Sequence, residues 1–82
     1  MVTPESIQSS IAAGIPCEHI AVEGDGHHFQ AVIVSEKFAG LSKIKQHQLV
    51  YAVLGDRMRE EIHALSMQTL TPEQWQERAP RG

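Results

Sequence analysis

The chain is short of the residues that build several common kinds of site. It has one cysteine, Cys17, among 82 residues, which excludes an internal disulfide framework and a zinc or iron–sulfur site made of four of its own cysteines. No apolar run approaches the roughly 20 residues needed to cross a bilayer. Positive charge is scarce too, since the formal net charge is −3. That balance disfavours nucleic acid as the main partner, because counterion release needs a basic face.

Length and composition predict one small globular domain. A hydrophobic content of 41% and a charged content of 21% are typical of a folded protein rather than a disordered one. The first ten residues have no positive charge and no apolar core, so we expect no signal peptide and a cytoplasmic location. Residues 1–82 are predicted to form a single domain, of which residues 79–82 are a flexible tail.

The first half of the chain predicts a helix followed by a hairpin. Thr3 and Pro4 are typical of a helix start, and isoleucines at a spacing of four continue the pattern. Alternating residues predict strands at 19–23 and 28–34. The two glycines between them favour a tight turn at 24–26.

The second half predicts two helices, a strand and a last short helix. A helix capped by Ser42 should run to about residue 59, with a break at Gly55. Residues 62–68 read as a strand, and Thr71 begins a short helix anchored by Trp75. A second helical patch, Leu49 and Val53, is expected to pack against the first helix. The stripe expected to face the core comprises Ile44, His47, Val50, Tyr51, Leu54 and Met58. The predicted class is α+β, in the order α-β-β-α-α-β-α, with a three-stranded mixed sheet and helices on one face.

Imidazoles gather in two segments far apart in the sequence. The loop GDGHHF at residues 24–29 contains His27 and His28, and the strand-like segment IHAL at 62–65 contains His63. Histidine is the commonest protein ligand for borderline and soft metals. If the fold brings the two segments together, imidazoles converge at one surface spot. Within the loop we favour His28, because the neighbouring Phe29 should pack in the core and fix the backbone.

The other candidate residues have simpler interpretations. His47 is expected to be a partly buried, hydrogen-bonded structural histidine, and His19 a solvated one. Cys17 is expected to be a small, buried or half-exposed thiol. No arrangement of nucleophile and base is apparent, so no enzymatic activity is expected.

Five segments, in this order along the chain, resemble the BolA family and within it the short BolA-like proteins of proteobacteria. They are residues 24–29, VSEKFAGLS at 34–42, QHQLV at 46–50, IHALS at 62–66 and LTPEQW at 70–75. The resemblance covers residues 7–78 and implies a fold like the type II KH domain and a non-enzymatic role.

The resemblance also implies a partner and a cofactor. Members of the family pair with monothiol glutaredoxins, and the heterocomplex holds a [2Fe–2S] cluster. Glutaredoxin supplies its cysteine and glutathione supplies a second thiolate. Carried onto this chain, the ligand from the last strand is His63, and the ligand from the loop is His28 or His27. In isolation the chain is expected to hold no cofactor and to be a monomer or a weak homodimer.

A second reading is a nucleic-acid-binding transcriptional regulator with a KH-like fold, active on stress or morphology genes. The small basic cluster of Lys37, Lys43 and Lys45 would carry weak DNA binding. Two features weaken this reading. The chain has no Gly-x-x-Gly loop of the kind that grips nucleic acid in KH domains, and it has Gln46 where many members of the family have an arginine before His47.

Overall fold

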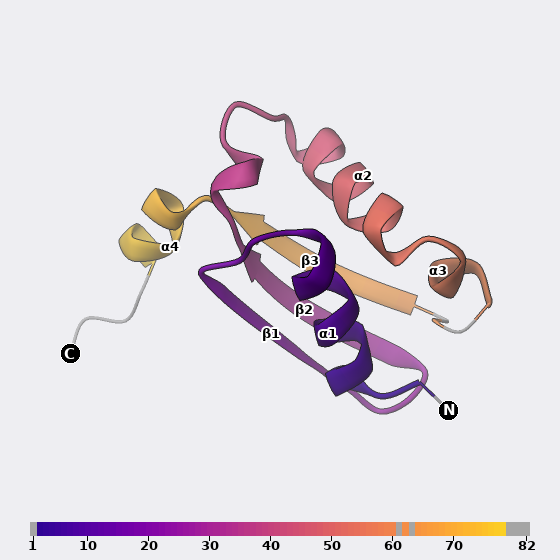
Figure 1. Ribbon diagram of the computed structural model, residues 1–82. Coiled ribbons are helices and arrows are strands. Elements are labelled where there is room, and N and C mark those ends of the chain that lie inside the picture. Colours follow the sequence, from indigo (N-terminus) through magenta and orange to yellow (C-terminus); the bar gives the residue numbers. More distant parts are fainter. Residues whose placement is uncertain (1, 61, 63, 79–82) are drawn as a thin grey trace.

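The computed structural model describes residues 2–60, 62 and 64–78 (Figure 1). The expected α+β class and element order are confirmed, with one 3-10 helix added. The described elements are α1 (Pro4–Gly14), β1 (His19–Gly24), β2 (His28–Val34), the 3-10 helix η1 (Glu36–Phe38), α2 (Lys43–Leu54), α3 (Asp56–Glu60), β3 (Ala64–Leu70) and α4 (Pro72–Arg78). Two predictions, the ligand His63 and the flexible tail at 79–82, lie outside the described residues.

The three strands form one mixed sheet in the order β1-β2-β3. β1 pairs with β2 antiparallel, and β2 pairs with β3 parallel. The arrangement is compatible with the expected likeness to a type II KH domain. β3 ends two residues later than predicted, because its register with β2 continues until Val34 faces Leu70. Both of these residues are buried.

The main core lies between one face of the sheet and the helices α1 and α2 (Figure 1). Alternate residues of β2, Phe29, Ala31 and Ile33, are buried on this face, as the period of two predicted. Helix α1 contributes Ile7 and Ile11. Its capping is as expected, since the Thr3 hydroxyl accepts a hydrogen bond of 3.1 Å from the Ser6 amide.

The break between α2 and α3 also lies where the sequence predicts it. Gly55 has a φ of 59°, a backbone conformation that glycine adopts at little cost. The predicted packing of Val53 against the first helix is confirmed, because a Cβ on Gly14 would lie 2.5 Å from Val53 Cγ1. The backbone of α1 at Gly14 therefore lies directly against the Val53 side chain of α2.

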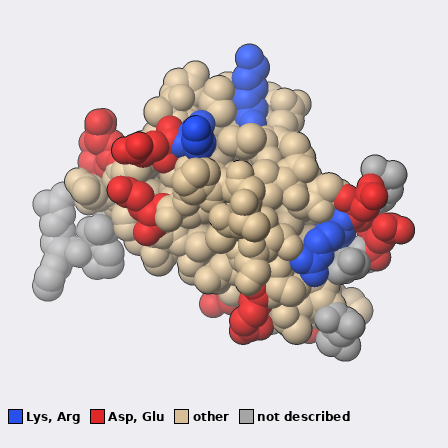
Figure 2. Space-filling model, in the orientation of Figure 1, with Lys and Arg blue, Asp and Glu red and all other residues tan. Residues whose placement is uncertain are grey.

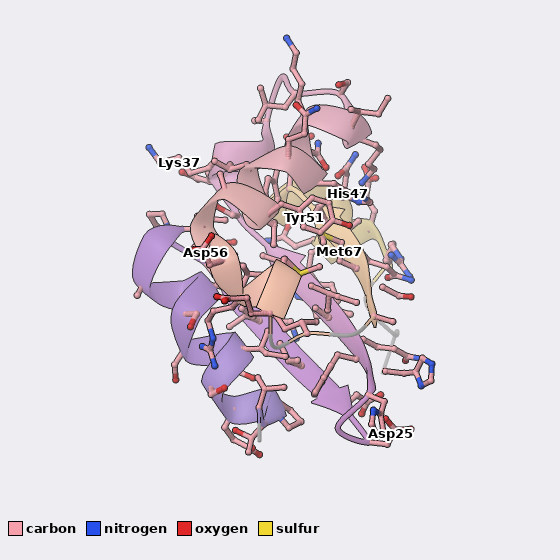
Figure 3. The ribbon with its side chains drawn as sticks, turned by 90° about the vertical axis from the view of Figure 1, so that its right-hand side faces the viewer. Asp25, Lys37, His47, Tyr51, Asp56 and Met67 are labelled. Atoms are coloured by element: carbon pink, nitrogen blue, oxygen red, sulfur yellow. The ribbon has the colours of Figure 1, made fainter. Side chains whose placement is uncertain are left out.

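The predicted buried stripe of α2 is wrong at Ile44 and Tyr51. Ile44 is 72% exposed and Tyr51 is 40% exposed, whereas Gln46 is buried. His47 is half-buried, and among the described residues its imidazole makes no hydrogen bond that would support the expected structural role. Figure 3 looks onto the face of the molecule that carries His47 and Tyr51.

The buried polar residue of α2 is Gln46. Its amide nitrogen donates to the carbonyl oxygens of Phe38 and Leu41, at 3.1 and 2.9 Å. Its amide oxygen accepts a 2.6 Å hydrogen bond from the Thr69 hydroxyl. The same side chain therefore links α2 to η1, to the segment after η1 and to β3. Burial of this polar group is favourable because both ends of the amide are hydrogen bonded.

Helix α4 packs at the end of the sheet, away from α1 and α2 (Figure 1). Its Trp75 ring stacks on His19 with centroids 4.5 Å apart and an interplanar angle of 14°. The expectation that His19 is solvated is therefore wrong. Thr71 and Gln74 form the predicted capping box, with reciprocal hydrogen bonds of 3.0 and 3.2 Å.

Candidate metal-binding site

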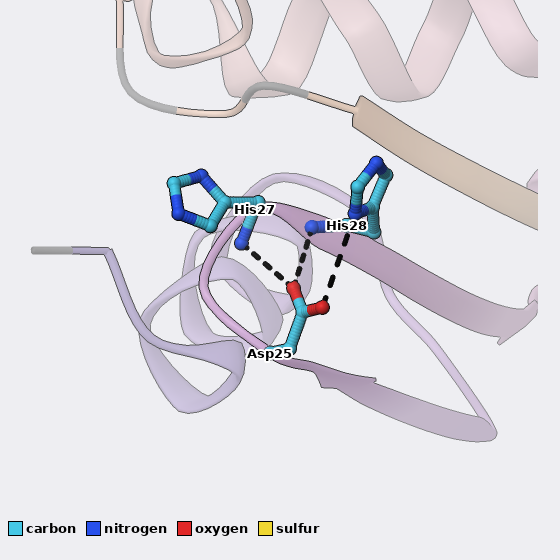
Figure 4. Close-up of polar contacts among 3 residues, drawn as sticks. All are labelled: Asp25, His27 and His28. Atoms are coloured by element: carbon cyan, nitrogen blue, oxygen red, sulfur yellow. Dashed lines mark hydrogen bonds and ion pairs between the residues drawn. The ribbon is translucent and has the colours of Figure 1, made fainter.

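The loop between β1 and β2 is organised by the side chain of Asp25. Its Oδ1 accepts hydrogen bonds from the backbone amides of His27, at 2.9 Å, and His28, at 2.8 Å (Figure 4). The Asp25 amide donates to the His28 carbonyl at 3.2 Å. An aspartate that bonds to amides two and three residues ahead is a common way to fix a tight turn. Sequence reasoning missed this role, although the Asp-Gly pair at the turn was its signal.

Two glycines allow the backbone conformation of this loop. Gly26 has a φ of 101°, which L side chains rarely adopt. A Cβ on Gly24 would lie 2.5 Å from the His28 carbonyl oxygen, too close for any larger residue. The loop backbone therefore passes close to His28, and His28 begins β2 with its position set by both Gly24 and Asp25.

The two loop imidazoles are accessible. His27 and His28 are both exposed, and the His28 side chain is 74% exposed. The His28 Nδ1 lies 3.9 Å from Asp25 Oδ2, beyond hydrogen-bond distance but within reach of an ion pair when the imidazole is protonated. Hydrogen bonds from the His28 and His27 amides lower the pKa of Asp25, so its carboxylate is ionised at neutral pH.

The loop lies beside the start of β3. The Ala64 amide donates to the His27 carbonyl at 3.1 Å, and His28 faces Ala64 in the parallel register. The structure thus brings the loop together with the segment that contained the third candidate histidine. In the sequence His63 immediately precedes Ala64, but His63 itself lies outside the described residues.

The described residues of this chain do not form a metal site by themselves. Within residues 2–60, 62 and 64–78 there is no group of three or more His, Cys, Asp or Glu side chains placed to hold a metal. The loop offers two exposed imidazoles, which are ligands suited to iron, copper and zinc. Cys17 lies outside the histidine loop. Burial raises the pKa of its thiol. The thiol donates a hydrogen bond to the Ile15 carbonyl at 3.1 Å.

A hollow in the described part of the chain lies away from this loop. It has a volume of about 710 Å³ and is lined in part by Glu18, Glu36 and Glu73. Glu18 precedes β1, whereas the histidine loop follows it, so the two regions lie at opposite ends of that strand. The hollow is wide and acidic, unlike the enclosed, mostly apolar pocket expected of a small-molecule site.

The three candidate lysines differ in their surroundings. The Lys43 ammonium group donates a hydrogen bond to the Thr69 carbonyl. Lys37 projects away from the body of the molecule (Figure 3). Figure 2 shows the Lys and Arg side chains of one face as separate protrusions, several with acidic side chains beside them, and no continuous basic surface on that face.

The fold and the loop together define a small α+β domain that presents two exposed histidine side chains at a tight turn. The chain belongs to the BolA family: a family model described as BolA-like protein matches residues 3–74. None of the helices in the described part of the chain is long and apolar enough to span a membrane.

Known relatives are similar over most of the chain. The acid stress protein IbaG of Escherichia coli K12 is 39% identical over 70 residues, which are 84% of this chain and 83% of that protein. The DNA-binding transcriptional regulator BolA of Vibrio cholerae is 41% identical over 59 residues, 72% of this chain and 56% of that protein. The solved structure of a BolA homologue from Coxiella burnetii has a TM-score of 0.80 at 42% identity, covering 93% of this chain and 99% of that one.

Proposed function

We propose that this protein is a non-enzymatic partner of a monothiol glutaredoxin and shares a [2Fe–2S] cluster with it, in iron–sulfur trafficking or sensing. The observation that carries the proposal is the pair of exposed imidazoles, His27 and His28, in a loop held by Asp25 beside the start of β3. Membership of the BolA family supports it, because the family resemblance implies this partner and this cluster.

The donor set explains why a partner is needed. Two thiolates from glutaredoxin and glutathione would leave two ligands to be supplied, and imidazoles of this chain would supply them. We assign one to His63 and the other to His28, with His27 as the alternative. Histidine in place of cysteine raises the reduction potential of a [2Fe–2S] cluster relative to all-cysteine ligation. Asp25 contributes by fixing the backbone from which the loop ligand projects.

Anaerobic reconstitution with a monothiol glutaredoxin and glutathione tests the proposal, with visible circular dichroism as the readout. The His63→Ala variant should lose the spectrum that is specific to the heterocomplex. The His28→Ala variant should weaken or shift it, and His27→Ala should do so less, because one of the two loop imidazoles is expected to dominate.

The His47→Ala variant is the matched control, since it removes a half-buried imidazole from α2 and leaves the histidine loop unchanged. Its spectrum should equal that of the wild type. A His63→Ala protein that keeps the wild-type heterocomplex spectrum would overturn the ligand assignment and, with it, the proposed function.

The second candidate function is DNA binding. It is favoured by the relative from Vibrio cholerae that is named a DNA-binding transcriptional regulator. Against it stand the net charge of −3 and the Lys43 ammonium group, which is already hydrogen bonded to Thr69. We therefore rank it below the cluster-sharing role.

A further inference from the structure

Strand β1 is an edge strand. The sheet order β1-β2-β3 gives it a neighbouring strand on one side only (Figure 1). Its sequence, HIAVEG, contains neither proline nor lysine, the residues that commonly protect an edge from pairing with another chain. At the other edge, β3, the Thr69 carbonyl already accepts a hydrogen bond from Lys43.

The register with β2 shows which backbone groups of β1 face the open edge. Asp25 donates to the His28 carbonyl, so these two residues form a hydrogen-bonded pair that continues the β1–β2 register. Hydrogen-bonded and non-hydrogen-bonded pairs alternate along an antiparallel ladder. The amide and carbonyl groups of Ile20 and Val22 therefore point away from β2, toward the open edge.

We propose that β1 pairs antiparallel with β1 of a second copy of this chain, with Ala21 facing Ala21 across the two-fold axis. In this register Ile20 faces Val22 of the other copy, and the two residues lie on the core side of the sheet, where both pack against the apolar core. His19 faces Glu23 of the other copy on the opposite side. The strand is thus complementary to itself in apolar contact and in hydrogen-bonding partners.

Backbone hydrogen bonding between the two copies favours the same register. Because Ile20 and Val22 both direct their amide and carbonyl groups outward, each pair of them exchanges two hydrogen bonds across the axis. A shift by one residue would place Ile20 opposite Glu23 and bring core-side residues against outward-facing ones. A shift that centres the axis on Val22 would lose the His19–Glu23 pairs.

The helix above the strand leaves room for the second copy. Helix α1 packs over β1, and its exposed residues Ala12 and Ala13 are small. The contact is limited to one strand and this helix, so it is smaller than a standard stable interface of roughly 1,600 Å². The dimer should therefore be weak and should form progressively as the protein concentration rises.

Sedimentation analysis over a range of protein concentrations tests the proposal with the Ala21→Lys variant. Ala21 is exposed, so the substitution leaves the fold intact but places two like charges opposite each other at the axis. We expect the dissociation constant of the dimer to rise by about fivefold or more. The control is Ser66→Lys, which adds the same charge at an exposed position of β3, two strands away from the proposed contact, and should leave the dissociation constant unchanged.

Disulfide cross-linking gives a second test that does not depend on affinity. In a Cys17→Ala background, Ala21→Cys should form a disulfide-linked dimer under mild oxidation, because Cα atoms of a non-hydrogen-bonded pair lie about 4.5 Å apart, within the range that a disulfide spans. A Gln30→Cys protein in the same background should cross-link far more slowly.

Three results would overturn the proposal. They are a monomer at every concentration, a dimer equally stable in the Ala21→Lys and Ser66→Lys variants, and cross-linking of the Ala21→Cys protein no faster than that of the Gln30→Cys control. A monomer would leave the open edge of β1 to a strand of a different protein.

Discussion

Asp25 stabilises the histidine loop through a carboxylate that must be ionised to accept its amide hydrogen bonds at full strength. Those bonds lower the pKa of Asp25 in the folded protein relative to the unfolded chain. The resulting stabilisation is therefore complete above the unfolded pKa of about 4 and is lost as the pH falls through the lower, folded pKa.

The Asp25→Asn variant should consequently be less stable than the wild type at neutral pH and equally stable at low pH. Asparagine keeps an oxygen that can accept from His27 and His28 but carries no charge to strengthen those bonds. Urea unfolding of both proteins at pH 7 and near pH 2 measures the difference. A difference in unfolding free energy that does not change with pH would show that the charge of Asp25 contributes nothing.

Single residues were predictable where the local sequence determines their surroundings. The GDGHHF segment was enough to place His27 and His28 at an exposed turn. The stacking of His19 on Trp75 was not predictable, since it depends on where α4 returns to the start of β1. Whether His63 joins the loop histidines stays a prediction from the family resemblance.

Gln46 holds three elements together, and its removal should be costly. Truncation to alanine would leave the Phe38 and Leu41 carbonyls and the Thr69 hydroxyl without the amide that bonds them. We expect Gln46→Ala to lower the free energy of unfolding by about 2–3 kcal/mol.

The neighbouring His47→Ala variant is the control for that measurement. Its half-buried imidazole makes no hydrogen bond among the described residues, so the loss should stay below about 1 kcal/mol. Chemical denaturation of both variants gives the comparison. Equal losses would mean that burial on α2, rather than the Gln46 network, sets its stability.

Elements were predicted well where capping and period agree, as at Thr3, Ser42 and the hairpin. On helix α2, in contrast, the pattern of the sequence did not predict which side chains are buried. A helical wheel sorts residues by polarity, so it left Gln46 out of the buried stripe and placed Ile44 in it. The structure reverses both, because carbonyl oxygens near η1 supply partners for a buried amide. The spacing of apolar residues along the helix cannot indicate such hydrogen-bond partners, because they belong to other segments of the chain.

At the scale of the whole molecule, the balance of charge determines how strongly and how selectively the chain should bind DNA. The net charge is −3, and the basic side chains on the face shown in Figure 2 do not form a continuous surface. Any binding should then depend on a few phosphate contacts, without base readout, and should vary little with sequence. Its affinity should fall steeply as salt rises.

Substitution of the lysines by alanine tests that prediction. Lys37 and Lys45 are exposed, so Lys37→Ala and Lys45→Ala should each reduce the slope of log affinity against log salt by about one. Lys43→Ala should reduce it less, because the Lys43 ammonium group already donates to the Thr69 carbonyl. Fluorescence anisotropy with two DNA duplexes of different sequence, over a series of salt concentrations, provides the slopes. Tight, sequence-selective binding at physiological salt would instead place DNA recognition ahead of cluster sharing, since phosphate contacts alone do not distinguish sequences.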